Sequence, residues 1–71
     1  MKVISTTDLS REGNDCYIYE TISLVEQFGI YAIITCRKVS GWAYDETIEV
    51  VFSSSERGKV MEKYYRLGGT I

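Results

Sequence analysis

Apolar and polar residues alternate along three stretches of the chain, and this period of two is typical of β-strands with one buried face. Residues 30–39 hold more β-branched and apolar side chains than any other stretch of that length, so we interpret them as the central strand of a small sheet. Residues 16–25 and 47–52 show similar patterns before and after it. We expect both to pair with the central strand through short connections.

The alternation also predicts which side chains share a face. The apolar set of the first strand is Cys16, Ile18, Ile22 and Leu24, that of the central strand is Ile30, Ala32, Ile34 and Cys36, and that of the third is Ile48, Val50 and Phe52. The first two sets meet only if the numbers of paired residues add up to an even sum, such as 54. We therefore expect a hairpin loop of three or five residues around Glu26, Gln27 and Phe28, with Gly29 at a positive φ.

After residue 52 the apolar spacing becomes helical. The apolar stripe consists of Val60, Met61, Tyr64, Tyr65 and Leu67. Ser53 and Glu56 have the spacing of a capping box at the helix start, and Gly68 with Gly69 favours the helix end. The pattern predicts one helix that covers one face of the sheet.

The N-terminal residues complete the predicted fold. Residues 2–6 are a candidate edge strand, and residues 7–15 are rich in turn-forming residues, which predicts a loop. The fold class is therefore α+β: a three-stranded antiparallel meander, with residues 2–6 as a candidate fourth strand, and one C-terminal α-helix packed on one face. A chain of 71 residues has room for one domain, and we expect residues 1–71 to form it.

The composition excludes several classes of function. The chain has no histidine and only two cysteines, so it lacks the ligands of a structural zinc site and the partners of a Cys–His catalytic pair. It contains no Gly-rich phosphate loop or nucleophile motif, and we expect no enzymatic activity, no catalytic residue, no metal and no cofactor. A net charge of -2, with Arg37 and Lys38 as the only cations of the three strands, argues against nucleic-acid binding.

The hydropathy of the chain bears on its location. No stretch approaches the roughly 20 apolar residues that span a bilayer, and the first residues lack the apolar core of a signal peptide. We expect a cytoplasmic protein that does not enter a membrane, with Cys16 and Cys36 as ordinary buried thiols.

One helix covers one side of a sheet, so the alternation also predicts an uncovered face. The side chains placed there are Tyr17, Tyr19, Thr21, Tyr31, Ile33, Thr35, Arg37, Thr47, Glu49 and Val51. Tyrosine near arginine is enriched at protein interfaces, although tyrosine and threonine are also good strand formers on a half-exposed surface. Exposed Ile33 and Val51 would reduce solubility, which favours an interface.

Two further features lie outside this face. Trp42 and Tyr44 stand next to Asp45 in the connection before the third strand, where Trp42 either anchors a partner or, as we favour, closes the open end of a small core. Glu20 points inward among apolar residues, so we expect it at the rim of the sheet or paired with a helix cation, namely Arg57, Lys59 or Lys63.

These features together predict a non-enzymatic protein-binding module. Its candidate partner-binding residues are Tyr17, Tyr19, Tyr31, Ile33, Arg37, Trp42, Tyr44, Asp45 and Glu49. Compact acidic sheet-plus-helix proteins of this size are common among phage- and virus-encoded inhibitors of host enzymes and defence complexes, anti-CRISPR proteins included, so we expect a stoichiometric inhibitor of a larger protein. The alternative is a self-assembling structural or regulatory domain that forms a homodimer through the tyrosine-rich face.

Overall fold

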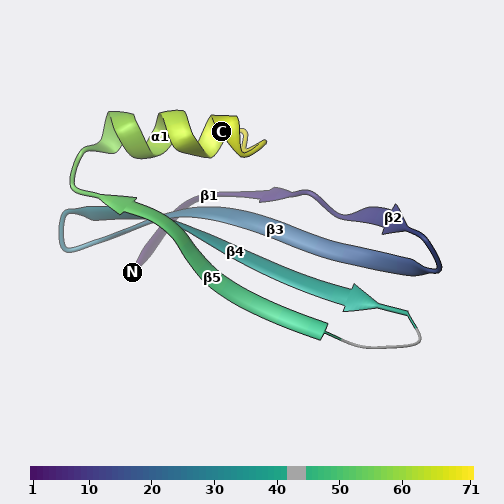
Figure 1. Ribbon diagram of the computed structural model, residues 1–71. Coiled ribbons are helices and arrows are strands. Elements are labelled where there is room, and N and C mark those ends of the chain that lie inside the picture. Colours follow the sequence, from purple (N-terminus) through teal and green to yellow (C-terminus); the bar gives the residue numbers. More distant parts are fainter. Residues whose placement is uncertain (42–44) are drawn as a thin grey trace.

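The computed structural model describes residues 1–41 and 45–71 and consists of an antiparallel sheet with one helix on it (Figure 1). Its elements are β1 (Lys2–Asp8), β2 (Arg11–Gly13), β3 (Cys16–Gln27), β4 (Ile30–Ser40), β5 (Asp45–Ser54) and α1 (Arg57–Arg66). The predicted α+β class is confirmed, with five strands in place of three or four.

The strands lie in the order β1, β3, β4, β5, and the short β2 pairs with β3 farther along the edge that β1 begins. Leu9 and Ser10 lie between β1 and β2, which follow β3 in the same register. The Ser10 N–H donates to the Asp8 carboxylate at 2.8 Å. β2 lies within residues 7–15, so the prediction that this whole segment is a loop was wrong. Residues 11–13 pair with residues 16–18 in a local hairpin, whose two-residue turn is Asn14 and Asp15. The turn residues were recognised, but the three-residue strand before them is too short to show an alternating pattern.

A two-residue turn joins β3 to β4. Phe28 and Gly29 both have a positive φ, 53° and 79°, which is the signature of a type I′ turn and suits the twist of the flanking strands. Gln27 is therefore opposite Ile30 and Leu24 is opposite Ile33, so that paired numbers add up to 57. The positive φ of Gly29 is confirmed, whereas the longer loop and the even sum were wrong.

The odd sum exchanges the faces of β4. The core consists of Ile22 and Leu24 from β3, Ile33 from β4, and Val60 and Tyr64 from α1. Ile33, predicted on the uncovered face, is 0% exposed beneath the helix. Ala32, Ile34 and Cys36 alternate with it and lie on the opposite face, because the geometry of the short turn fixes the register of the hairpin.

A β-bulge divides β5. Ile33 is opposite Phe52 but Ile34 is opposite Val50, so Val51 is the extra residue on β5. The bulge puts Phe52 on the side of the core and leaves Ile48 and Val50 on the other face. The prediction that all three would face the core is correct only for Phe52.

Helix α1 packs along the half of the sheet next to the β3–β4 turn (Figure 1). Of its predicted stripe, Val60 and Tyr64 are buried and Met61 is partly buried, whereas Tyr65 and Leu67 stay exposed. The capping box does not form: Glu56 is the N-cap without a side-chain capping bond, and its N–H donates to Ser54 Oγ at 3.1 Å.

The C-terminal end of α1 agrees with the prediction. Gly68 has a φ of 98°, and the N–H groups of Gly68 and Gly69 donate to the carbonyls of Tyr65 and Tyr64. These two bonds define a Schellman motif, in which glycine readily adopts the left-handed conformation.

The last residues then dock on β1. Ser5 Oγ donates to the Thr70 carbonyl at 2.8 Å, and the Thr70 N–H donates to Thr7 Oγ1 at 3.0 Å. Side chains of β1 thus hold the chain that follows α1 on the face of the sheet that α1 covers.

Candidate interaction surface

The face of the sheet opposite α1, called the outer face here, carries side chains in rows that cross β3, β4 and β5. The register defines four rows: Tyr19, Lys38 and Glu46; Thr21, Cys36 and Ile48; Ser23, Ile34 and Val50; Val25, Ala32 and Ser53. Ile48 and Val50 are 68% and 60% exposed, which is high for aliphatic side chains of a strand. The part of the outer face next to β5 is therefore apolar and open.

Two tyrosines extend this surface toward the end of the sheet away from α1. Tyr17 and Tyr19 lie two residues apart on β3 with ring centroids 4.4 Å apart and planes tilted by 54°, and Tyr19 is 52% exposed. Beside them, Lys38 and Glu46 form a loose ion pair at 4.0 Å. Aromatic and aliphatic groups with few net charges are the composition found at the centre of protein interfaces.

The structure separates the predicted binding residues onto two faces. Tyr17 and Tyr19 lie on the outer face, whereas Tyr31, Arg37, Asp45 and Glu49 lie on the face of α1 and Ile33 is buried there. The prediction that the tyrosines, Ile33, Arg37 and Glu49 share one face was wrong, because the odd register puts odd-numbered residues of β3 opposite even-numbered residues of β4. Asp45, predicted in the connection before the third strand, is the first residue of β5. Trp42 and Tyr44 lie outside the described residues, and so does the choice between the two roles of Trp42.

Charged side chains occupy the α1 face beyond the helix. Glu20 is opposite Arg37 in the register but pairs with Arg11 of β2 at 2.7 Å. The predicted helix partners of Glu20 are wrong, since α1 covers the other half of the sheet. On the outer face, where Asp8 ends β1 opposite Thr21, hydrogen bonds from the Ser10 hydroxyl and N–H hold the pKa of the Asp8 carboxyl below its ordinary value.

Phe28 is a candidate contact residue that the sequence reasoning missed. It lies at the tip of the β3–β4 turn, is 93% exposed and has a left-handed backbone. Asn, Asp or Gly is the usual residue at this position of a type I′ turn, and a bulky side chain there is strained. The sequence contained one indication of this position: Phe28 directly precedes Gly29, between two runs of alternating apolar and polar residues, where a turn tip is expected.

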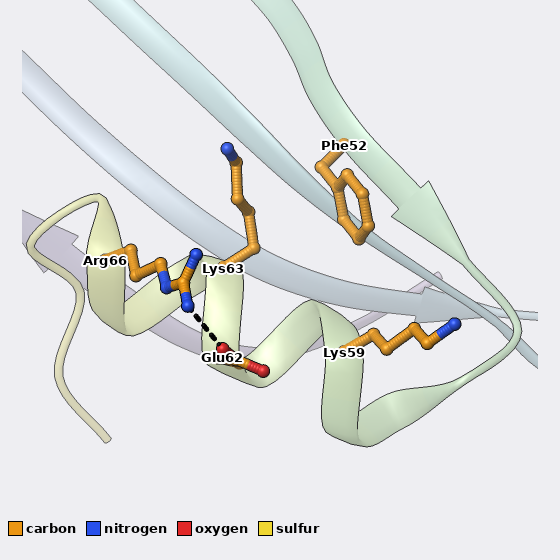
Figure 2. Close-up of a pocket in the computed structure, with 5 residues that line it drawn as sticks. All are labelled: Phe52, Lys59, Glu62, Lys63 and Arg66. Atoms are coloured by element: carbon orange, nitrogen blue, oxygen red, sulfur yellow. Dashed lines mark hydrogen bonds and ion pairs between the residues drawn. The ribbon is translucent and has the colours of Figure 1, made fainter.

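A shallow hollow lies between α1 and β5 (Figure 2). It measures about 210 Å³ and is lined by Phe52, Lys59, Glu62, Lys63 and Arg66. Arg66 binds Glu62 at 2.7 Å and Lys59 binds Glu56 at 3.0 Å, while Lys63 makes no ion pair within residues 1–41 and 45–71. The hollow is smaller than the roughly 300–1,000 Å³ of typical ligand sites, and it makes this side of α1 basic.

Residues 1–41 and 45–71 contain no group of three or more metal-ligating side chains, and α1 is too short and too polar to cross a membrane. Cys16 and Cys36 are free and only half-buried.

Comparison of the chain with protein-family models, with curated proteins and with solved structures gives no match. Function is therefore inferred from the surfaces themselves.

Proposed function

We propose that this chain is a non-enzymatic protein-binding module that binds a larger protein through its outer face. The observation that supports this most is the exposure of Tyr19, Ile48 and Val50 on a face that α1 leaves uncovered. Exposed apolar area of this kind reduces the solubility of a small protein, so its presence favours a surface that a partner covers.

The chemistry of the outer face suits a protein partner. Tyrosine buries a large ring with few rotatable bonds and keeps a hydroxyl available for a hydrogen bond, so Tyr17 and Tyr19 are suitable anchors. Phe28 lies nine residues from Tyr19, about 30 Å along β3, which is too far for one compact group of contacts. We therefore centre the site on Tyr17, Tyr19, Ile48 and Val50.

Binding of this kind acts stoichiometrically, because it covers a surface of the partner and requires no chemistry. The partners to test first are the larger enzymes and defence complexes of the kind that phage- and virus-encoded inhibitors block. In that setting the module inhibits by occupying a surface that the partner needs.

The test compares two substitutions that add the same charge to opposite faces. Tyr19→Glu changes the outer face, and Thr47→Glu changes an exposed position on the face of α1. Each tagged variant is used to isolate partners from the source organism, and the purified pair is then titrated by calorimetry. We expect wild type and Thr47→Glu to bind one protein at a ratio of one to one, and Tyr19→Glu to lose more than about tenfold in affinity.

Two results contradict the proposal. One is equal affinity of Tyr19→Glu and wild type, and the other is a wild-type chain that retains no protein stoichiometrically. Far-UV circular dichroism of all three chains verifies that a loss of binding is not a loss of fold.

A further inference from the structure

Strand β5 forms an open edge of the sheet. Among residues 1–41 and 45–71 it pairs with β4 on one side and with no strand on the other. Natural edge strands are usually protected by lysine, proline, a β-bulge or a covering segment. Residues 45–50 precede the bulge at Val51 and contain neither lysine nor proline. Their charged residues are the acids Asp45, Glu46 and Glu49. The exposed Ile48 and Val50 lie on either side of Glu49.

We propose that a second copy of this chain pairs with β5 in antiparallel orientation, centred on Ile48. A two-fold axis perpendicular to the sheet keeps both outer faces on the same side, and it requires the numbers of paired residues to add up to an even sum. With a sum of 96, Ile48 meets Ile48 of the second copy and Glu49 meets Thr47. Sums of 94 and 98 instead oppose Asp45 to Glu49 and Glu49 to its own copy, and like charges directly opposite are unfavourable.

Charge complementarity favours the second copy over a foreign strand. In this register Asp45 of one copy lies beside Val51 of the second copy. Phe52, which follows Val51, lines the basic hollow of that second copy. Asp45 is on the face of α1, because it pairs with Val39, which pairs with Ile18. Adjacent strands are only about 4.8 Å apart, so the flexible stems of Lys59 and Lys63 can reach this carboxylate.

The symmetry forms this contact twice, and each copy supplies both the acid and the cation. Lys63, which makes no ion pair within the described residues, gains a partner. The product is one continuous sheet with two helices on the same side. The dimer leaves the outer faces of both copies, with Tyr17 and Tyr19, uncovered on the same side. Ile48 belongs to both proposals, and the tests of the dimer therefore use the purified chain without a partner.

The first test is size-exclusion chromatography with light scattering between about 1 and about 500 μM, since interfaces of this small size associate weakly. We expect wild type to shift from monomer to dimer and Ile48→Lys to stay monomeric. Tyr19→Lys adds the same charge to the same face on β3 and should still dimerise. Three results overturn the proposal: a monomeric wild type, a dimer that persists in Ile48→Lys, and a dimer that dissociates in Tyr19→Lys. The third result would indicate that the two copies pack through their outer faces.

The second test exchanges charges between the copies. Asp45→Lys and Lys63→Asp should each weaken their own homodimer by about threefold or more, because each places like charges together twice. An equimolar mixture should form a heterodimer tighter than either homodimer, since both contacts then join a lysine to an aspartate. If the mixture associates no better than the two separate variants, the contact with α1 is wrong.

The third test reports the register. In a chain carrying Cys16→Ser and Cys36→Ser, the Ile48→Cys variant should form a disulfide-linked dimer with oxidised glutathione, because the two copies of residue 48 are directly opposite. Val50→Cys in the same chain is the control. Its two copies would lie four residues apart, about 13 Å, which exceeds the reach of a disulfide. Stronger cross-linking of Val50→Cys overturns the register.

Discussion

Tyr64 joins three parts of the chain that are far apart in sequence. Its buried hydroxyl meets Thr7 Oγ1 of β1 at 2.8 Å and the Ile22 carbonyl of β3 at 3.3 Å. Its ring lies against Gly69, and Thr7 in turn accepts a hydrogen bond from the Thr70 N–H. One side chain of α1 therefore orders both β1 and the residues after the helix.

Removal of this hydroxyl tests its contribution. Tyr64→Phe should lower the free energy of unfolding by about 1–2 kcal/mol, because buried hydrogen bonds are lost while the ring stays in the core. Urea denaturation followed by circular dichroism measures the change. Tyr65→Phe removes a hydroxyl from an exposed ring of the same helix and should stay within about 0.5 kcal/mol of wild type. Equal effects of the two substitutions would show that the buried network contributes nothing.

For a single residue, the sequence predicts whether the side chain faces the core better than it predicts which residues the side chain contacts. The helical spacing predicts that Tyr64 faces the core, and the structure confirms it. The bonds to Ser5 and Thr7 could not be predicted, since they cross 57 or more residues and depend on how the chain after Gly69 turns back over β1.

Among the elements, α1 contains Gly58, and Gly69 follows its C-terminal end; these two glycines have different surroundings. A Cβ at Gly58 meets no atom within 4 Å, whereas a Cβ at Gly69 would overlap the ring of Tyr64. Of Gly58 and Gly69, only Gly69 has no room for a side chain.

Alanine substitutions at these two glycines should have opposite effects. Gly58→Ala should raise the free energy of unfolding by about 0.5–1 kcal/mol through helix propensity, and Gly69→Ala should lower it by about 1–3 kcal/mol through overpacking. Thermal or urea unfolding provides both values. A stabilising Gly69→Ala would mean that the C-terminal residues move freely away from Tyr64.

The turn between β3 and β4 allows a test of what Phe28 is for. Phe28→Asn should increase stability by about 1 kcal/mol, because Asn tolerates the left-handed backbone that Phe28 has to adopt. Phe28→Ala removes the ring but keeps the conformational cost, so its stability should change by less than about 0.5 kcal/mol. Denaturant unfolding of the three chains measures this, and an Asn variant no more stable than the Ala variant would contradict it.

This same turn limited what the sequence could predict. The strands and the helix follow from the periods of two and 3.6, but the face that each strand presents depends on whether the loop has an odd or an even number of residues. Asn-Gly is a typical sequence of a two-residue type I′ turn, whereas Phe28 before Gly29 is not, so the sequence did not predict this turn. The bulge at Val51 then reassigned Ile48 and Val50, and no local signal marked it.

The whole molecule is long and thin, with principal extents of 41, 19 and 15 Å. A helix of ten residues is only about 15 Å long, so α1 shields the sheet next to the β3–β4 turn and leaves the rest as a single layer (Figure 1). The five residues of the buried core lie in the shielded half.

Hydrogen exchange should report this difference. We expect the amides of Leu24 and Ile33 to exchange slowest and those of Tyr19 and Lys38 to exchange at least about tenfold faster, since local opening is easiest where few apolar contacts are lost. NMR at low protein concentration measures the exchange of each amide in the monomer. Uniform protection along β3 and β4 would mean that the sheet opens as one unit.

The single-layer half of the sheet also determines the shape of partner that can use all of its side chains. A single-layer sheet with its side chains is about 10 Å thick, so this half of the sheet fits into a cleft of that width on a partner. The walls of such a cleft would contact Tyr19 on one side and Arg37 on the other at the same time. Residues that the register places back to back then form one binding site, whereas a flat partner can contact only one of them.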